Sequence, residues 1–386
     1  MDTSSMTIAN ERILIPFGQL VFNGNTSFQD QQHLDDFCKW AISAKLEPLL
    51  HFTISEQIQQ PYKEQFKKEY LIALAKSMIF EHQLNQLKQI LKKQTIRFTF
   101  IKGADLAFNA FPSPAIRTFN DIDLLLHPDD TKDALQILKD NGWEAPYFRA
   151  PNPGEHHFPP FFKDKIVLEP HWTLPNFKLE DPKIIWEHIP QDNNGDFRLS
   201  NELNLLLVAR HAASEQYRHL PIHRILLDAG YIAKNEVDWN ALKNLAYAWN
   251  LPPPQDLFAA WEPFFPKDII AQMAPNKSAT RAFEKIFELR ASIPSISNHD
   301  IVMQSRDIAS KHWIQDRLAG LRPKTIRAKY KLPPKGNYLE LLATYIKDIT
   351  AKASVFCKHM VHRKPDIAKY NKLIELAENQ SRNNNP

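Results

Sequence analysis

Hydrophobic and polar positions follow two different periods along the chain. Between residues 62 and 93, apolar side chains recur every three or four positions among lysines and glutamines, and this spacing predicts one long helix. Residues 34–50 repeat the helical spacing over a shorter stretch. Residues 95–174 instead contain short, β-rich apolar runs separated by turns, so this is the only region that predicts strands. Residues 1–30 show no clear period and are predicted to be irregular.

The predicted elements follow this change of period. Strands are expected at 95–101, at 121–126, at 143–148 and in two later runs, with helices beginning near residue 104 and covering 129–141. After a polar loop at 182–200, helical spacing returns at 201–213 and 219–233, and Asp238 is the expected N-cap of the next helix. Further helices are expected at 258–265, 279–291 and 338–356. The predicted fold class is therefore α+β: a small mixed β-sheet core flanked by helices, with a largely helical C-terminal half.

The same pattern divides the chain into four parts. A helical region at 1–94 is expected to pack on a core at 95–200, followed by a helical domain at 201–255 and a helical region at 256–386 whose polar tail is disordered.

Composition limits the class of protein. A hydrophobic content of 43% supplies real cores, and a net charge of +4 is not diagnostic of nucleic-acid binding. The two cysteines give neither a disulfide framework nor a metal-binding spacing. No apolar run reaches the ~18 residues of a membrane span, and the N-terminus lacks a signal-peptide pattern, so we expect a cytoplasmic protein.

Two aspartates open the predicted strand at 121–126. Asp121 and Asp123 are two positions apart, and alternate side chains of a strand point to one face, so both carboxylates are expected to project together. Adjacent carboxylates repel each other unless a cation lies between them. Because Mg²⁺ binds carboxylate and phosphate oxygens together, the pair indicates a site for a metal-bound nucleoside triphosphate.

Other residues around this pair suit the same chemistry. Gly103 ends the first strand and opens a helix, whose N-terminal N–H groups favour phosphate. Lys102 and Arg117 are the nearest cations for phosphate oxygens, and a salt bridge is the alternative role for each. Glu169 ends the apolar run at 166–168, and from a neighbouring strand it would complete a site for two metal ions.

These residues carry a family resemblance. The chain resembles the uncharacterised bacterial nucleotidyltransferase family of the polymerase-β-like superfamily, most clearly over residues 100–174. The matching positions are Lys102-Gly103, Arg117, Asp121, Asp123, the run His156-His157-Phe158, and Glu169-Pro170-His171-Trp172.

The resemblance implies an activity and roles for these residues. It implies transfer of a nucleoside monophosphate from an NTP, such as ATP, to an acceptor, with two Mg²⁺ ions as cofactors and release of pyrophosphate. The implied catalytic metal ligands are Asp121, Asp123 and Glu169, and the implied nucleotide-binding residues are Lys102, Gly103, Arg117, His157 and His171.

Two features depart from the superfamily pattern. Many members have Gly-Ser at the turn, whereas Gly103-Ala104 offers no hydroxyl to the phosphates. The interval from Gly103 to Asp121 is also long, so residues 111–120 must loop out before the acidic strand. A nucleotide-binding or partner-binding module without turnover is therefore an alternative function.

Several roles stay open. The acceptor is a small molecule, a peptide, a protein or a tRNA, and a toxin-like enzyme acting on tRNA or protein is a further alternative. Its only support is the basic segment from Arg306 to Lys335, for which a solvated surface is the favoured interpretation. Histidines 156, 157 and 171 are candidate metal ligands, phosphate donors or general bases, or hydrogen-bonded loop residues. Asp228 and Arg224 are expected to form an ion pair, with substrate contact as the alternative.

Overall fold

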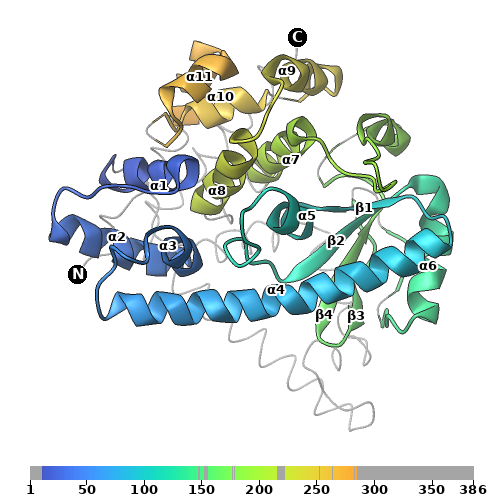
Figure 1. Ribbon diagram of the computed structural model, residues 1–386. Coiled ribbons are helices and arrows are strands. Elements are labelled where there is room, and N and C mark those ends of the chain that lie inside the picture. Colours follow the sequence, from blue (N-terminus) through green and yellow to red (C-terminus); the bar gives the residue numbers. More distant parts are fainter. Residues whose placement is uncertain are drawn as a thin grey trace, which may run out of the picture. The chain divides into compact units, whose positions relative to one another are not determined.

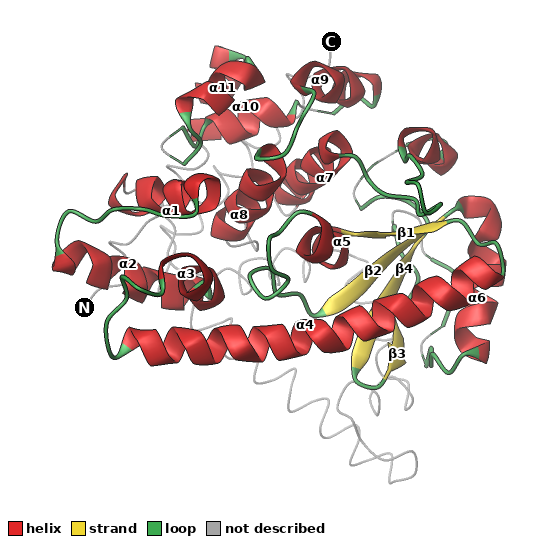
Figure 2. Cartoon of the chain, viewed as in Figure 1, coloured by secondary structure: helices red, strands yellow, loops and turns green. Residues whose placement is uncertain are grey.

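The computed structural model describes residues 11–284, apart from 147, 152–154, 176, 178, 215–221, 252, 263 and 282. All of these residues belong to one of the two compact units into which the chain divides. They form a small mixed sheet accompanied by many helices, so the predicted α+β fold class is confirmed (Figure 2). Most of the predicted helix at 279–291, the basic segment from Arg306 to Lys335, the helix at 338–356 and the polar tail lie outside the described residues.

Four strands form the sheet, in the order β1-β2-β4-β3 (Figure 1). β1 (Phe98–Ile101) runs antiparallel to β2 (Asp121–Leu126), and β2 runs parallel to β4 (Ile166–His171). β3 (Phe161–Lys163) runs antiparallel to β4. The parallel pair at the centre is joined through α6 (Thr131–Asp140), as a crossover between parallel strands requires.

The predicted strand at 143–148 is wrong. Among the described residues of this stretch, only Glu144 forms an isolated bridge, to Phe162. Trp143 is instead 2% exposed, and its backbone N–H bonds the carbonyl of Leu138 at the end of α6. Pro146 follows and has no N–H for a strand ladder, so Trp143 packs in the core without belonging to a strand.

One face of the sheet is apolar and packs against helices. Because side chains alternate along a strand, the even-numbered residues of β2 lie on this face, opposite Asp121 and Asp123. They join an apolar core cluster with α4 (Tyr62–Lys93) and α6. The strand and helix residues of that cluster include Phe98, Phe100, Ile122, Leu124, Leu126, Ile166, Leu168, Phe80, Leu84, Leu87, Leu91, Leu135 and Leu138. The opposite, polar face carries Asp121, Asp123, Glu169 and His171 beside apolar residues such as Leu125.

The long helix predicted at 62–93 is confirmed with the same bounds. Its buried stripe repeats at helical spacing, and Figure 1 shows the helix running past the sheet. The helical pattern at 34–50 is two helices, α2 (Gln31–Ala44) and α3 (Glu47–Ile54), because the chain turns through a left-handed residue at Lys45.

The prediction that residues 1–30 are irregular is wrong for α1 (Glu11–Asn23). Pro16 lies inside this helix and cannot donate a hydrogen bond to the carbonyl of Arg12. His33 Nε2 donates to that carbonyl instead, at 2.7 Å. The apolar residues Ile13, Leu14, Phe17, Leu20 and Val21 are all buried, so tertiary packing outweighs the proline.

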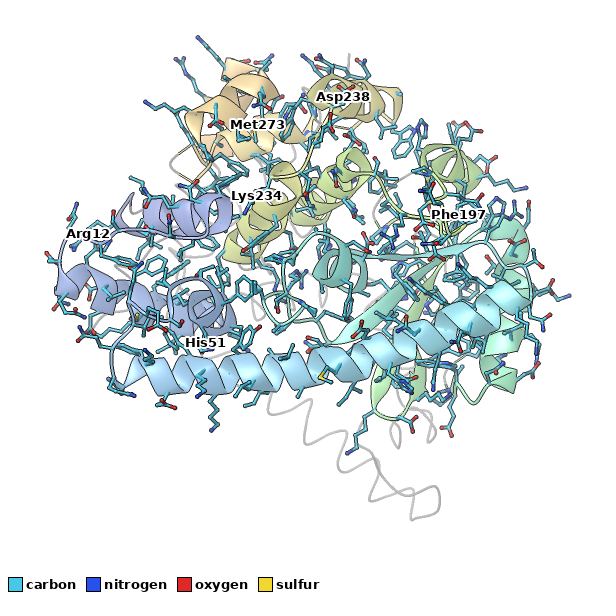
Figure 3. The ribbon with its side chains drawn as sticks, viewed as in Figure 1. Arg12, His51, Phe197, Lys234, Asp238 and Met273 are labelled. Atoms are coloured by element: carbon cyan, nitrogen blue, oxygen red, sulfur yellow. The ribbon has the colours of Figure 1, made fainter. Side chains whose placement is uncertain are left out.

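Helices make up the elements after residue 201 in the part of the chain that the structure describes. The labelled ones are α7 (Asn201–Ser214), α8 (Ile222–Ala233), α9 (Trp239–Ala248), α10 (Pro254–Ala259) and α11 (Lys267–Met273), and residues 277–281 are helical as well. The helix expected at 258–265 is thus displaced, since α10 ends at Ala259. The predicted N-cap is confirmed: Asp238, labelled in Figure 3, accepts bonds from the N–H groups of Asn240 and Ala241.

The division of the chain into four parts stays a prediction. None of the helices within the described residues is both long enough and apolar enough to cross a membrane.

Candidate functional site

The polar face of the sheet brings the predicted acidic residues together. In the parallel register of β2 and β4, Asp123 lies opposite Glu169, and Asp121 precedes Asp123 on the same face. Adjacent strands are about 4.8 Å apart, so the side chains of the register pair are direct neighbours. A short motif in one strand and a single acid in another therefore form one cluster.

Asp123 is the centre of this cluster. Its side chain is almost fully buried, and Oδ1 accepts hydrogen bonds from Lys102 Nζ at 2.7 Å and from His171 Nε2 at 2.9 Å. Burial raises the pKa of Asp123, but the bonds and charges of His171 and Lys102 outweigh it and lower the pKa to about 2. Asp123 is therefore a permanent negative charge at neutral pH.

The two neighbouring acids are shifted in the opposite direction. Burial, followed by the negative charge of Asp123, raises the pKa of Asp121 and also that of Glu169. Three carboxylates thus share a partly buried region in which each makes ionisation of the others harder. A divalent cation reverses that balance, because it favours the ionised form of every carboxylate around it.

The donor set fits a divalent metal ion. Ligand atoms of Asp123, Glu169 and His171 all lie within 4.8 Å of one another. The carboxylates suit Mg²⁺. For His171, Nε2 faces Asp123, while Nδ1 is buried without a hydrogen-bond partner. A metal-ligating histidine normally donates its other N–H to an acceptor, so the imidazole fits better as a donor that orients Asp123 than as a ligand.

Two more histidines lie beside His171. His157 forms an isolated antiparallel bridge with His171, and the prolines at 159–160 interrupt the ladder between this bridge and β3. The rings of His156 and His157 each have their centroid 5.3 Å from that of His171. Burial and the neighbouring imidazoles lower the pKa of His156 to about 3, so its ring is neutral at physiological pH. One side of the cluster is therefore an imidazole wall, formed by these three histidines.

Lys102 and Gly103 form the turn from β1 into α5 (Lys102–Asn109). Lys102 has a φ of 55°, in the left-handed region that residues with side chains rarely occupy. A Cβ on Gly103 would lie 2.7 Å from the Cβ of Phe119, so a side chain does not fit there. Since the last residue of β1 pairs with Asp123, the free N–H groups of the first turn of α5 lie beside the acidic strand.

Arg117 takes the alternative role that the sequence allowed, a salt bridge, in a buried position. Its guanidinium is buried and binds both carboxylate oxygens of Asp228 on α8, with Nη2 2.9 Å from Oδ2. The expected partner of Asp228 was Arg224, and the structure corrects that pairing. Arg117 also donates to the carbonyl of Thr118, so its charge is neutralised and its donors are engaged within the loop that precedes β2.

Two cations, Arg224 and Lys76, contact the loop before Asp121, which the sequence did not indicate. Arg224 Nη2 donates to the carbonyl of Thr118 at 3.2 Å, and Lys76 Nζ of α4 donates to Asn120 Oδ1 at 2.7 Å. Lys76 was assigned no role from the sequence, because nothing local distinguishes it from other lysines on the polar side of a long helix. Only the fold brings α4 and α8 to the loop before Asp121.

A family model supplies the remaining observation. Comparison with curated proteins and with solved structures gives no match. The model of a family described as uncharacterised nucleotidyltransferase matches residues 30–259, which include the acidic cluster, the imidazole wall, the Gly103 turn and both cations beside Asp121. That match spans more than half of the chain and holds every residue of the candidate site. The chain therefore belongs to this uncharacterised nucleotidyltransferase family.

Proposed function

We propose that the protein is a metal-dependent nucleotidyltransferase of the polymerase-β-like superfamily, which transfers a nucleoside monophosphate from an NTP to an acceptor. The observation that carries the proposal is the register pair of Asp123 and Glu169 on the polar face of the sheet, with Asp121 on the same face. The family match supports the transferase class.

Asp121, Asp123 and Glu169 would hold two Mg²⁺ ions. When bound, these ions supply charge neutralisation to the phosphate oxygens of the nucleotide. The chain's own contribution is to hold the carboxylates in place before the nucleotide arrives. Asp123 is held by Lys102 and His171, which keep it ionised and oriented.

The proposed reaction is a displacement at the α-phosphorus. An acceptor hydroxyl forms a bond to that phosphorus, the bond to the bridging oxygen of the β-phosphate breaks, and pyrophosphate leaves with the bonding electrons. The hydroxyl proton passes to solvent, because bound cations would keep Glu169 ionised as one of their ligands. Holding the hydroxyl and the α-phosphorus in line accounts for most of the rest of the rate acceleration.

The geometry supports some of the predicted nucleotide-binding residues better than others. Lys102 and Gly103 lie at the helix N-terminus beside Asp123, which suits phosphate. The ring of His157 has its centroid 5.3 Å from that of His171, and its charge acts on Glu169. His157 is therefore placed to contact a nucleotide bound next to Glu169. Arg117 is already paired with Asp228, so we assign it the placement of the loop before Asp121 in addition to any phosphate contact.

The test is turnover by the full chain. Each NTP, labelled at the α-phosphate, is incubated with Mg²⁺ and candidate acceptors, and pyrophosphate release is measured alongside mass spectrometry of the acceptors. We expect one nucleotide to release pyrophosphate only with metal, and Asp123→Asn to abolish the release while the circular dichroism spectrum stays unchanged. Equal release by wild type and Asp123→Asn would contradict the proposal.

A module that binds nucleotide without turnover is the second candidate. Ala104 favours it, because it offers no hydroxyl to phosphate and is buried in the apolar core cluster. This candidate predicts metal-dependent NTP binding by wild type with no pyrophosphate release for any acceptor. The toxin-like alternative depends on the segment from Arg306 to Lys335, which lies outside the described residues.

A further inference from the structure

A pair of cations next to the acidic cluster has no role in the reaction described so far. Lys76 comes from α4 and Arg224 from α8, elements separated by more than a hundred residues in the chain. Both reach the short loop that leads into β2: Arg224 Nη2 bonds the carbonyl of Thr118, and Lys76 Nζ bonds Asn120 Oδ1. They therefore flank the chain immediately before Asp121.

Neither cation forms a salt bridge with a carboxylate among the described residues. Arg117, only a few residues before Asp121, shows the contrast, since both oxygens of Asp228 bind its guanidinium. Lys76 and Arg224 bond only to neutral oxygens, and neither side chain is fully exposed. A partly buried cation without a counter-ion is unfavourable, and a bound anion removes that cost.

The electrostatics of the two side chains agree with this description. Burial, followed by repulsion from Arg224, lowers the pKa of Lys76. Burial, followed by repulsion from Arg117, lowers the pKa of Arg224. For Arg224 the negative charges of Asp228 and then Asp121 compensate in part, and for Lys76 that of Asp121 does, so both cations lie close enough to Asp121 to sense its charge.

The Gly103 turn adjoins the same loop. A Cβ on Gly103 would lie 2.7 Å from Phe119 and 3.6 Å from Nη1 of Arg117, so the first turn of α5 packs directly on residues 117–119. The N-terminal N–H groups of a helix of eight residues and two incompletely compensated cations thus surround one end of β2. The imidazole wall lies beside β4, on the side of the cluster away from β1.

We propose that Lys76 and Arg224 form an oxyanion site beside Asp121, which binds the phosphate tail of the nucleotide. This assignment rests on the proposed function and adds to it the side from which the nucleotide enters: the tail lies toward α4 and α8, and the acceptor approaches from the imidazole wall. A guanidinium suits two phosphate oxygens at once, and an ammonium adds a point charge. A phosphate group on the acceptor is the other ligand that the same two cations could bind.

The probes are inorganic pyrophosphate with Mg²⁺, each NTP with Mg²⁺, and the matching nucleosides, titrated calorimetrically into the full chain. Arg224→Gln and Lys76→Gln are compared with wild type and with Lys183→Gln, a lysine whose 2.7 Å salt bridge to Asp129 lies on the surface. We expect each site variant to weaken pyrophosphate and NTP binding about tenfold, as loss of one charged hydrogen bond implies. Nucleoside binding, the melting temperature and the control should change little.

The outcomes separate this inference from the proposed function. Normal NTP and pyrophosphate binding by both site variants would overturn the oxyanion site while leaving the transferase proposal intact. If the variants bind NTP normally but bind inorganic phosphate more weakly at saturating NTP, the site belongs to the acceptor and the assignment to the nucleotide tail is wrong. If wild type binds neither pyrophosphate nor any NTP, both proposals fail.

Discussion

Lys102 Nζ lies 2.7 Å from Asp123 Oδ1. Lys102 directly follows Ile101, the β1 residue that pairs with Asp123 on β2. The contact depends on the left-handed backbone of Lys102, which turns the chain from β1 into α5. Backbone strain of this kind costs on the order of 1–3 kcal/mol and persists only where the surroundings enforce it. Here the buried ion pair and the closely packed Gly103 turn enforce it.

Replacing Lys102 tests the phosphate role of this turn. Lys102→Met keeps the length of the side chain and removes its charge, so NTP–Mg²⁺ binding should weaken roughly ten- to a hundredfold. Lys183→Met is the matched control, because Lys183 makes a salt bridge of the same 2.7 Å length far along the chain. Calorimetric titration gives the dissociation constants of both variants. Normal nucleotide binding by Lys102→Met would show that the lysine only supports Asp123 and does not bind phosphate.

Adding one methyl group tests how tightly the turn is packed. In Gly103→Ala the new Cβ would lie 2.7 Å from that of Phe119, so the helix or the loop before β2 must move. Overpacking of this kind should lower the free energy of unfolding by about 1–3 kcal/mol and weaken nucleotide binding. Gly195→Ala is the control, since it has a φ of 74° but open space around the new atom. Urea unfolding should show a loss in the control without any change in nucleotide affinity.

The Arg117–Asp228 pair should contribute mainly to the stability of the fold. Asp228→Asn leaves a buried guanidinium uncompensated, and we expect a loss of about 3–5 kcal/mol in the free energy of unfolding. The double variant Arg117→Met with Asp228→Leu removes both charges and should recover much of that loss. If Asp228→Asn unfolds at the wild-type urea concentration, the pair does not hold the loop before Asp121.

His223 provides a pH-dependent term in stability. Burial, followed by the charge of Arg224, lowers its pKa to about 4, while the unfolded chain keeps the ordinary value near 6.5. Between these values the unfolded state binds more protons, so stability rises with pH; the contribution is complete above about 6.5 and is lost as the pH falls toward 4. His223→Gln should flatten the stability profile in that window by up to about 3 kcal/mol. An unchanged difference between pH 7 and pH 4.5, from urea midpoints, would contradict this assignment.

Local patterns predicted a large part of this molecule. Asp121 and Asp123 could be placed on one face because strand alternation is a property of neighbouring residues. The helix at 62–93 followed for the same reason. Glu169 required the further assumption that two strands separated by a helix pair side by side, which the β2–β4 register satisfies.

The parts that could not be predicted depend on distant packing. Arg117 and Asp228 are 111 positions apart, and no spacing rule connects a loop residue to a helix at that distance. The helix α1 was missed, because neither its burial against other elements nor the hydrogen bond from His33 to the Arg12 carbonyl is visible in the local sequence. Lys76 gained a neighbour at Asn120 only when α4 crossed the loop before β2.

Glu169→Gln is the sharpest test of the acidic cluster. Glu169 is opposite Asp123 in the register, yet only half-buried, and its side chain forms no hydrogen bond to another described residue that a glutamine would break. Burial and Asp123 raise the pKa of Glu169, so replacing its carboxylate by a neutral amide should leave stability unchanged or slightly improved. The amide is a weaker metal ligand than the carboxylate, so metal-dependent turnover should fall by at least about a hundredfold, the upper end of the loss seen when even an outer partner of a metal ligand is removed. Pyrophosphate release and urea unfolding measured on the same preparation separate the two effects. Full turnover by Glu169→Gln would remove this residue from the mechanism and leave Asp121 and Asp123 as the only acidic metal ligands of the proposed site.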